Sequence, residues 1–262
     1  MALARADLES LLRVRRLDRT LTTALPGART RHGDTHATGL DELDARLEGG
    51  LPRGHLSELV GPRSSGRLSV LLQLIAAATT RGELVALVDA LDMLDVASLE
   101  AAGAVLDRVL WVRGHVVVNP GFCRDLNQRA MEQAIRALSL VLQAGNFGLV
   151  ALDIGEAPVD AIRRLPFTTW LRLQRMIEGS STVCVLVGSV PMARSSAGLT
   201  IKLGPGPEAR GLGASGMTVV RAARFEPHGF SGIDLEGRIV RARAHACEGV
   251  SLKVSTIASA DV

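Results

Sequence analysis

Tyrosine is absent from this chain, and lysine, cysteine and aromatic side chains are scarce. Its 262 residues include two lysines and three cysteines, and aromatics make up 3%. An odd number of widely separated cysteines argues against a disulfide framework and against a cysteine-based zinc site. With so few aromatics, a stacking platform for nucleic-acid bases is not supported.

The charge that is present comes almost entirely from arginine. Of the 30 basic residues only Lys202 and Lys253 are lysines, which leaves 28 arginines, and the formal net charge is +3. This balance permits an acidic partner such as DNA without requiring one. The six histidines do not cluster with cysteines or carboxylates at metal-ligand spacing, so no metal is expected. No apolar run reaches membrane-spanning length and no apolar signal core begins the chain, which predicts a cytoplasmic protein with no membrane partner.

Alternating apolar segments predict an α/β fold with a mainly parallel sheet between helices. Continuous apolar runs without period-2 alternation are typical of strands buried on both faces, and amphipathic helices separate them. Shorter strands after residue 198 are expected to be antiparallel. The expected strands are 55–61, 83–89, 108–113, 148–154 and 181–188, and the expected helices are 40–47, 67–82, 123–144 and 167–178.

The chain is expected to contain three parts. Residues 1–35 form an N-terminal arm with a helix at 6–22 and a linker that extends to 39, residues 36–250 form the core, and residues 251–262 form a flexible tail. The helical arm could support self-association, dock another partner or fold on its own core. The glycine- and proline-rich stretch 204–216 is expected to be a mobile loop.

The stretch "GPRSSGRLS" (61–69) nearly matches the phosphate-binding pattern G-x-x-x-x-G-K-[ST]. Gly61 and Gly66 have the required spacing between a strand and a helix, where loop N–H groups and the helix N-terminus favour an anion. Arg67 replaces the lysine, and Leu68 replaces the hydroxyl residue that would ligate Mg²⁺. A strand-ending Asp153 fits the position of a metal-holding aspartate. The candidate phosphate site comprises Gly61, Ser64, Ser65, Gly66, Arg67, Ser69 and Asp153, and is either a weak phosphate binder or a turn that binds nothing.

A longer stretch resembles the RecA family. "TGLDELDARLEGGLPRGHLSELVGPRSSGRLSVLLQLIAAA" (38–78) is similar to the family's opening, from its threonine-glycine start to the phosphate loop and following helix. "LVALD" (149–153) is similar to the family's metal-binding strand. The resemblance implies a RecA-like core across residues 36–250.

The same resemblance implies that catalysis has been lost. The family's catalytic glutamate falls on Leu91, and its phosphate-sensing Asn-Gln pair falls on Gly188 and Ser189. With Arg67 and Leu68, four functional positions have changed, and each such group normally contributes several kcal/mol. We therefore expect no catalytic residue, no ATP hydrolysis and no cofactor beyond weak nucleotide binding.

A degenerate, compact RecA-like chain resembles the ImuA family of SOS-induced accessory proteins. That resemblance implies a role in translesion DNA synthesis, with RecA, an ImuB-like inactive polymerase homologue and a C-family polymerase as partners. DNA is a further expected contact, through Arg163, Arg164 and Arg194, which fall near the family's two DNA loops. A DNA-dependent ATPase or recombinase and a SulA-like cell-division inhibitor remain as alternatives.

Overall fold

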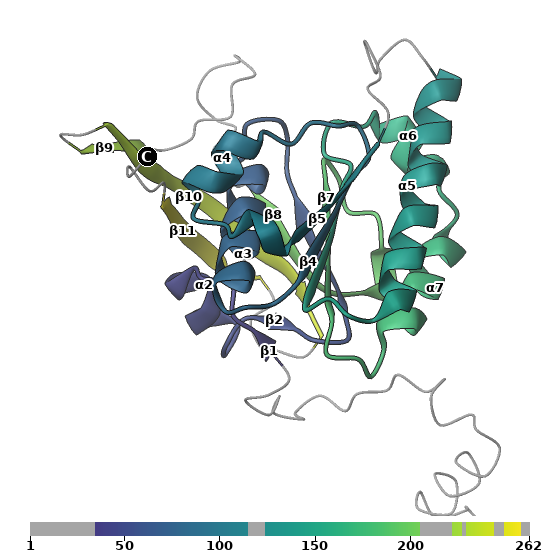
Figure 1. Ribbon diagram of the computed structural model, residues 1–262, viewed down its shortest axis with the longest axis horizontal. Helices are drawn as coiled ribbons and strands as arrows, with labels where there is room; N and C mark the ends of the chain where they lie inside the picture. The colour runs from purple at the N-terminus through teal and green to yellow at the C-terminus, as the bar shows by residue number, and fades with distance from the viewer. Residues whose placement is uncertain (1–34, 115–123, 205–221, 227–228, 244–248, 258–262) are drawn as a thin grey trace, which may run out of the picture.

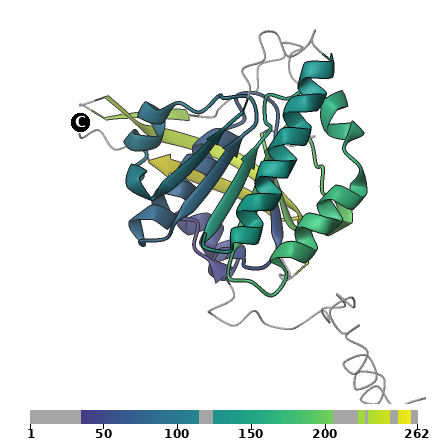
Figure 2. The same ribbon diagram turned by 45° about the vertical axis from the view of Figure 1, so that its right-hand side comes forward.

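The computed structural model describes residues 35–114, 124–204, 222–226, 229–243 and 249–257. Within these ranges a twisted sheet lies between two layers of helices (Figures 1 and 2). The helices are α2 (Asp41–Arg46), α3 (Arg67–Thr80), α4 (Val96–Ala101), α5 (Arg124–Ala144), α6 (Val159–Arg164) and α7 (Phe167–Ile177), with short 3₁₀ turns η2 (Leu106–Arg108) and η3 (Arg194–Ser196). The strands are β1 (Thr35–His36), β2 (Leu51–Pro52), β3 (Leu56–Val60), β4 (Val85–Asp89), β5 (Val109–Arg113), β6 (Leu149–Asp153), β7 (Val183–Gly188), β8 (Ala197–Leu203), β9 (Ala222–Glu226), β10 (Gly229–Ala242) and β11 (Ser251–Ile257).

The main sheet has the strand order β11-β10-β8-β3-β7-β6-β4-β5, and β9 pairs with β10. The strands from β8 to β5 in this order are all parallel to one another. β10 runs antiparallel to β8, β9 and β11. The predicted parallel α/β fold with antiparallel strands near the C-terminus is therefore confirmed.

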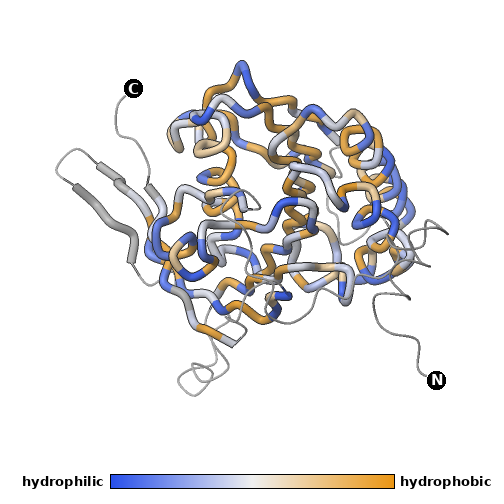
Figure 3. The backbone as a smooth tube through the Cα atoms, turned by 90° about the horizontal axis from the view of Figure 1, so that it is seen from below, coloured by the Kyte–Doolittle hydropathy of each residue, from blue (hydrophilic) through white to orange (hydrophobic). Residues whose placement is uncertain are grey.

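Two apolar clusters form the core, one on each face of the sheet. One cluster joins α2 and α3 to the sheet, and the other joins α5, α6 and α7 to the opposite face. β3, β4 and β7 are buried along their whole length, which explains why their sequences are apolar without alternation. Apolar positions accordingly gather on the sheet and on the inward sides of the helices (Figure 3).

The structure corrects several boundaries predicted from the sequence. Residues 251–257 are not a tail but strand β11, which pairs with β10 from Gly232 to Arg238. Thr35 and His36, expected at the end of a linker, form β1 and pair with β2. β10 spans 14 residues, so the C-terminal strands are not all short. The arm helix at 6–22 and most of the expected loop at 204–216 lie outside the described residues.

Candidate functional site: a phosphate-type loop with an inward arginine

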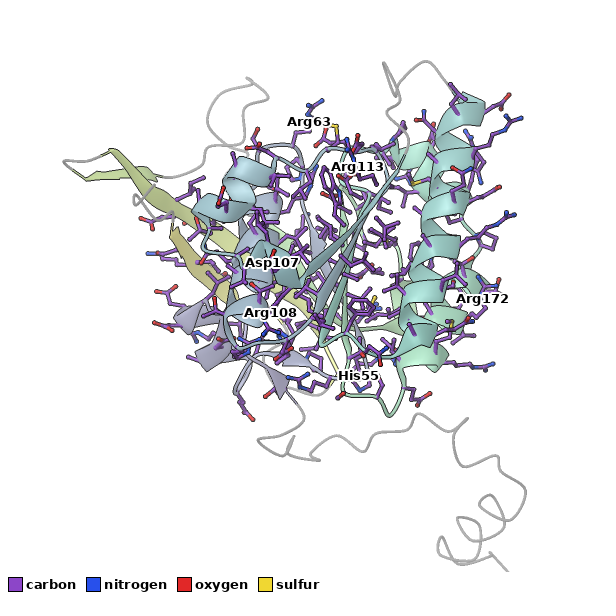
Figure 4. The ribbon with its side chains drawn as sticks, in the orientation of Figure 1. His55, Arg63, Asp107, Arg108, Arg113 and Arg172 are labelled. Atoms are coloured by element: carbon purple, nitrogen blue, oxygen red, sulfur yellow. The ribbon has the colours of Figure 1, made fainter. Side chains whose placement is uncertain are left out.

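The predicted loop lies at the edge of the sheet where the parallel strands end. β3, β7, β6 and β4 are consecutive neighbours, so Gly61, Gly188, Asp153 and Asp89 all lie at their C-terminal ends. Arg63 is at this end of the molecule and His55, which precedes β3, is at the other (Figure 4). Because ligands of open α/β sheets bind outside the carboxyl ends of the strands, this edge is the candidate site.

The loop keeps the backbone shape of a phosphate-binding turn. Ser64 has a φ of 58° and Gly66 a φ of 83°, both left-handed, before α3 begins at Arg67. A Cβ on Gly66 would lie 2.3 Å from Leu235 Cδ2 of β10, so glycine is required there for packing as well as for conformation. The hydroxyl of Ser65 is buried and has no hydrogen-bond partner among the described residues. Ser69 lies in the first turn of α3.

The Arg67 side chain points into the protein. Its Nη1 donates to the Gly61 carbonyl at 2.5 Å, and its Nη2 donates to the Gly155 carbonyl at 2.8 Å and to Glu156 Oε1 at 2.6 Å. Arg67 is 6% exposed. A Cβ on Gly155 would lie 2.6 Å from Arg67 Nε, so this glycine makes room for the guanidinium. The arginine therefore ties the loop to the segment that follows β6.

The residues present do not fit a magnesium-nucleotide complex of the RecA kind. Leu68, at the position of the metal-ligating hydroxyl, offers no oxygen and is 36% exposed. Leu91, at the position of the catalytic glutamate, is buried in the cluster beneath α5, α6 and α7. The Arg67 guanidinium already donates hydrogen bonds to three acceptors of its own chain. The loop keeps the shape of the site, but the hydroxyl that would ligate the metal and the carboxylate that would activate water are replaced by Leu68 and Leu91.

Two aspartates end adjacent strands at this edge, in register with each other. Asp89 Oδ2 accepts the Leu94 N–H at 2.8 Å, while its buried Oδ1 has no partner among the described residues. Asp153 Oδ1 accepts the Gly155 N–H at 2.8 Å. Burial raises the pKa of Asp153 from its ordinary value of 3.8 to about 6, and the charge of Asp89 adds to this rise. The hydrogen bond from Gly155 and the charge of Arg67 lower it only in part.

We expect Asp153→Asn to stabilise the protein at pH 7.5 by about 2 kcal/mol, allowing for partial solvent screening of this partly exposed group. The folded state binds the Asp153 proton more tightly than the unfolded state does. The contribution of Asp153 to the free energy of unfolding therefore falls as pH rises from about 4 through about 6. Asparagine keeps the acceptor for Gly155 and removes the charge. Urea unfolding at pH 7.5 and pH 4 measures the effect.

The gain from Asp153→Asn should be nearly absent at pH 4, where the native aspartate is already protonated. Exposed Asp107 serves as the matched control, because Asp107→Asn removes the same charge far from a buried environment. An equal gain at both pH values, or no gain at pH 7.5, would show that Asp153 carries no electrostatic strain.

The arginines expected to contact DNA are not gathered in one place. Arg163 and Arg164 are exposed at the end of α6, which follows the C-terminal end of β6. Arg194 is exposed in η3, three residues before Ala197, which pairs with Leu56 at the opposite end of the sheet. DNA contact through these residues therefore stays a prediction, and the structure separates them into two regions.

Residues 189–196, the crossover segment, lie along the sheet rather than beyond its edge. They connect the end of β7 to the start of β8, passing β3, and Met192 and Ala193 are buried against the same face as α7. Glu58 Oε1 of β3 accepts the N–H groups of Met192 and Ala193, both at 2.7 Å. Its Oε2 accepts the Thr200 hydroxyl at 2.7 Å. A buried carboxylate thus fixes the crossover segment, which contains Arg194.

Sequence reasoning did not identify Glu58 or Glu156 as site residues. Glu58 carries a signal, since a charged residue inside the apolar run "HLSELVG" must have partners where it is buried. Glu156 follows Asp153 by three residues in a polar turn and carries no comparable signal. Its role depends on the fold, which brings it to Arg67.

Neither a membrane span nor a metal cluster is found in the part of the chain that the structure describes. None of its helices is both long and apolar enough to cross a bilayer. No group of three or more histidines, cysteines, aspartates or glutamates is placed there to hold a metal ion. Cys184 is buried in β7, and burial raises the pKa of its thiol to about 12, so it is unreactive.

Comparison with known proteins also indicates a RecA-like core. Residues 20–115 match the RecA N-terminal domain. The chain is RecA-like. It is 27% identical over 171 residues to the RecA protein of Desulfotalea psychrophila, covering 60% of this chain and 44% of that one. It is 30% identical over 189 residues to the RecA protein of Thioalkalivibrio sulfidiphilus, covering 63% and 51%.

These similarities are distant and partial. The RecA-like chain spans about half the length of the curated relatives it matches. The matched region includes the loop at 61–69, so Arg67 and Leu68 lie within the part of the chain that matches the RecA N-terminal domain.

Proposed function

We propose that this RecA-like protein is a non-hydrolysing accessory protein of the ImuA type in bacterial damage-induced translesion synthesis. It acts in the cytoplasm by binding RecA and polymerase components, with DNA as a further contact. The similarity to proteins named RecA supports the DNA-repair setting. The inward Arg67, bound to Gly61, Gly155 and Glu156, is the observation that supports the loss of catalysis.

Arg67 is a poor substitute for a phosphate-loop lysine in this arrangement. Turning the guanidinium outward to a terminal phosphate would leave the two buried carbonyls without their donor, at a cost of about 1–3 kcal/mol each, and would break the ion pair with Glu156. A lysine carries a compact charge on a flexible stem, whereas the planar guanidinium is held by the direction of its bonds. Arg67 is therefore better suited to tie the loop to the segment after β6 than to stabilise a phosphate during phosphoryl transfer.

We expect the full chain to release no phosphate from ATP and Mg²⁺, with or without single-stranded DNA. The double substitution R67K/L68T should stay inactive, because Leu91 still lies in the core and offers no base for the attacking water. Phosphate release is measured against a RecA protein assayed in parallel. Robust DNA-stimulated hydrolysis by the wild-type chain would instead establish the ATPase or recombinase alternative.

A binding assay tests the accessory role. The tagged chain is mixed with purified RecA, an ImuB-like protein, a C-family polymerase or the tubulin-like division protein, and retention is compared. Retention of RecA or a polymerase component supports the proposal. Retention of the division protein alone overturns it in favour of a SulA-like inhibitor.

A further inference from the structure

The two helix layers of the protein carry opposite charge. The helices α5, α6 and α7 on one face of the sheet contain seven arginines and three acidic residues, which gives a net charge of +4. The helices α2, α3 and α4 on the other face contain two arginines and four acidic residues, which gives a net charge of −2. Because the whole chain carries +3, its positive charge is concentrated on one helix layer, which favours an acidic partner there.

The arginines of this layer are exposed to solvent. Arg129 and Arg136 belong to α5, and Arg172 and Arg175 belong to α7, which packs against α5. None of these four side chains forms an ion pair with another residue that the structure describes. Arg172 lies on the outer side of the layer (Figure 4). Four guanidinium groups are therefore open to a partner on the outside of two adjacent helices.

The outer face of α5 also exposes apolar side chains in a regular stripe. Its members follow one another at spacings of three, four, three and four residues, so they lie on one face of the helix. This α5 stripe consists of Leu126, Arg129, Gln133, Arg136 and Leu140, all of them exposed. Leu126 is 52% and Leu140 68% exposed. The stripe extends over about 21 Å, or four helical turns.

The order of side chains along the α5 stripe matches an acidic helix. Side chains at alternating three- and four-residue spacing meet those of a second helix that runs along the first. Apolar side chains of that helix would cover the two leucines, and carboxylates between them would pair with the two arginines. The phosphates of a nucleic acid would satisfy the arginines but leave the leucines without an apolar partner. The stripe has the same order in both directions, so it accepts either orientation of the second helix.

Neither the acidic helix layer of a second copy nor the N-terminal segment matches the α5 stripe. α2 and α4 have six residues each, less than two turns, and their leucines Leu43 and Leu99 are buried. The segment 6–22 contains four arginines and three acidic residues, so it lacks the negative charge. The side chains that complement the stripe therefore have to come from another protein.

We propose that the α5 stripe, with Arg172 and Arg175 of α7 beside it, is the docking site for an acidic amphipathic helix of a partner protein. The leucines at the two ends anchor the helix, and the arginines select it by charge. The inference rests on the proposed function and deepens it, since it assigns a surface and a chemistry to the binding of a protein partner.

Fluorescence anisotropy with a labelled 21-residue peptide, stapled to hold it helical, tests the docking site on the full chain. One face of the peptide carries leucine, three glutamates and leucine at the spacing of the α5 stripe. Arg136→Glu is expected to weaken binding about tenfold, and Leu140→Gln about fivefold. Arg46→Glu in α2 and Met93→Gln after β4 are the matched controls, because both residues are exposed outside this layer, and they should leave the affinity unchanged.

Three results would overturn the inference. The first is equally tight binding of a peptide in which lysines replace the glutamates. The second is wild-type affinity in both Arg136→Glu and Leu140→Gln, each shown to be folded by circular dichroism. The third is binding of a DNA duplex that is weakened by Arg136→Glu, while Leu140→Gln changes the affinity for neither ligand, because this would assign the surface to nucleic acid.

Purified RecA and polymerase components separate the inference from the proposed function. Loss of their retention in Arg136→Glu, with retention by Arg46→Glu, supports both. Equal retention by the wild type and Arg136→Glu would overturn the inference alone, because the partners would then bind elsewhere. Retention of none of them by a wild-type chain that binds the peptide would contradict the proposed function alone.

Discussion

Replacing Glu58 by methionine is expected to lower the free energy of unfolding by about 3 kcal/mol, because two buried backbone N–H groups lose their acceptor. These are the N–H groups of Met192 and Ala193 in the crossover segment, and the Thr200 hydroxyl loses its acceptor as well. Glu58 itself is fully buried in β3, so water cannot replace the missing oxygens. Urea unfolding followed by circular dichroism measures the loss, with an unchanged m-value expected.

Glu58→Gln separates hydrogen bonding from charge. Glutamine keeps one oxygen for the two N–H groups, and its amide can donate to the Thr200 hydroxyl, which is free to rotate. We therefore expect a loss of at most about 1 kcal/mol. Hydrogen exchange at Met192 and Ala193 should accelerate in Glu58→Met and change little in Glu58→Gln. Equal losses in the two variants would show that Glu58 does not act through these hydrogen bonds.

Replacing Arg67 by methionine is expected to destabilise the protein by about 2–3 kcal/mol. The guanidinium satisfies the Gly61 and Gly155 carbonyls and pairs with Glu156, and methionine fills the space without donating to any of them. The same urea unfolding experiment measures the loss. A residue at this position of an open phosphate loop would instead be exposed to solvent, and its removal would cost little.

A double-mutant cycle tests whether Arg67 acts through Glu156. Arg67→Met and Glu156→Gln are combined, and the loss in the double variant is compared with the sum of the two single losses. A coupling of at least about 1 kcal/mol is expected for a pair at 2.6 Å with one partner buried. Additive losses would show that the ion pair between Arg67 and Glu156 contributes nothing to the free energy of unfolding.

Elements with a strong local pattern were predictable, and elements that depend on a distant partner were not. The apolar runs of β3, β4, β6 and β7 are buried on both faces, so their composition predicts both strand and parallel sheet. β11 was predicted as a tail because a seven-residue strand at a sheet edge takes its stability from the strand beside it. The short helices α4 and α6 have six residues each, too few to show a periodic apolar stripe.

In the candidate site, too, some features were predictable from the sequence and others were not. The positions of the loop and of Asp153 were predictable, because a strand, a glycine-rich turn and a helix follow one another in the sequence. The orientation of Arg67 was not predictable, since its partner Glu156 lies 89 positions away. The separation of Arg194 from Arg163 and Arg164 was also not predictable from the sequence, because it depends on the crossover segment lying along the sheet.

The sequence by itself determined which chemical groups this RecA-like protein lacks: no lysine at 67, no hydroxyl at 68 and no carboxylate at 91. No fold can supply a group that is not in the chain. The tertiary structure alone decided what the substituted groups do instead. β6 lies two strands from β3, which brings Gly155 and Glu156 to Arg67. The guanidinium stays with the two buried carbonyls and the partly exposed Glu156 carboxylate, because leaving the buried carbonyls unpaired costs free energy.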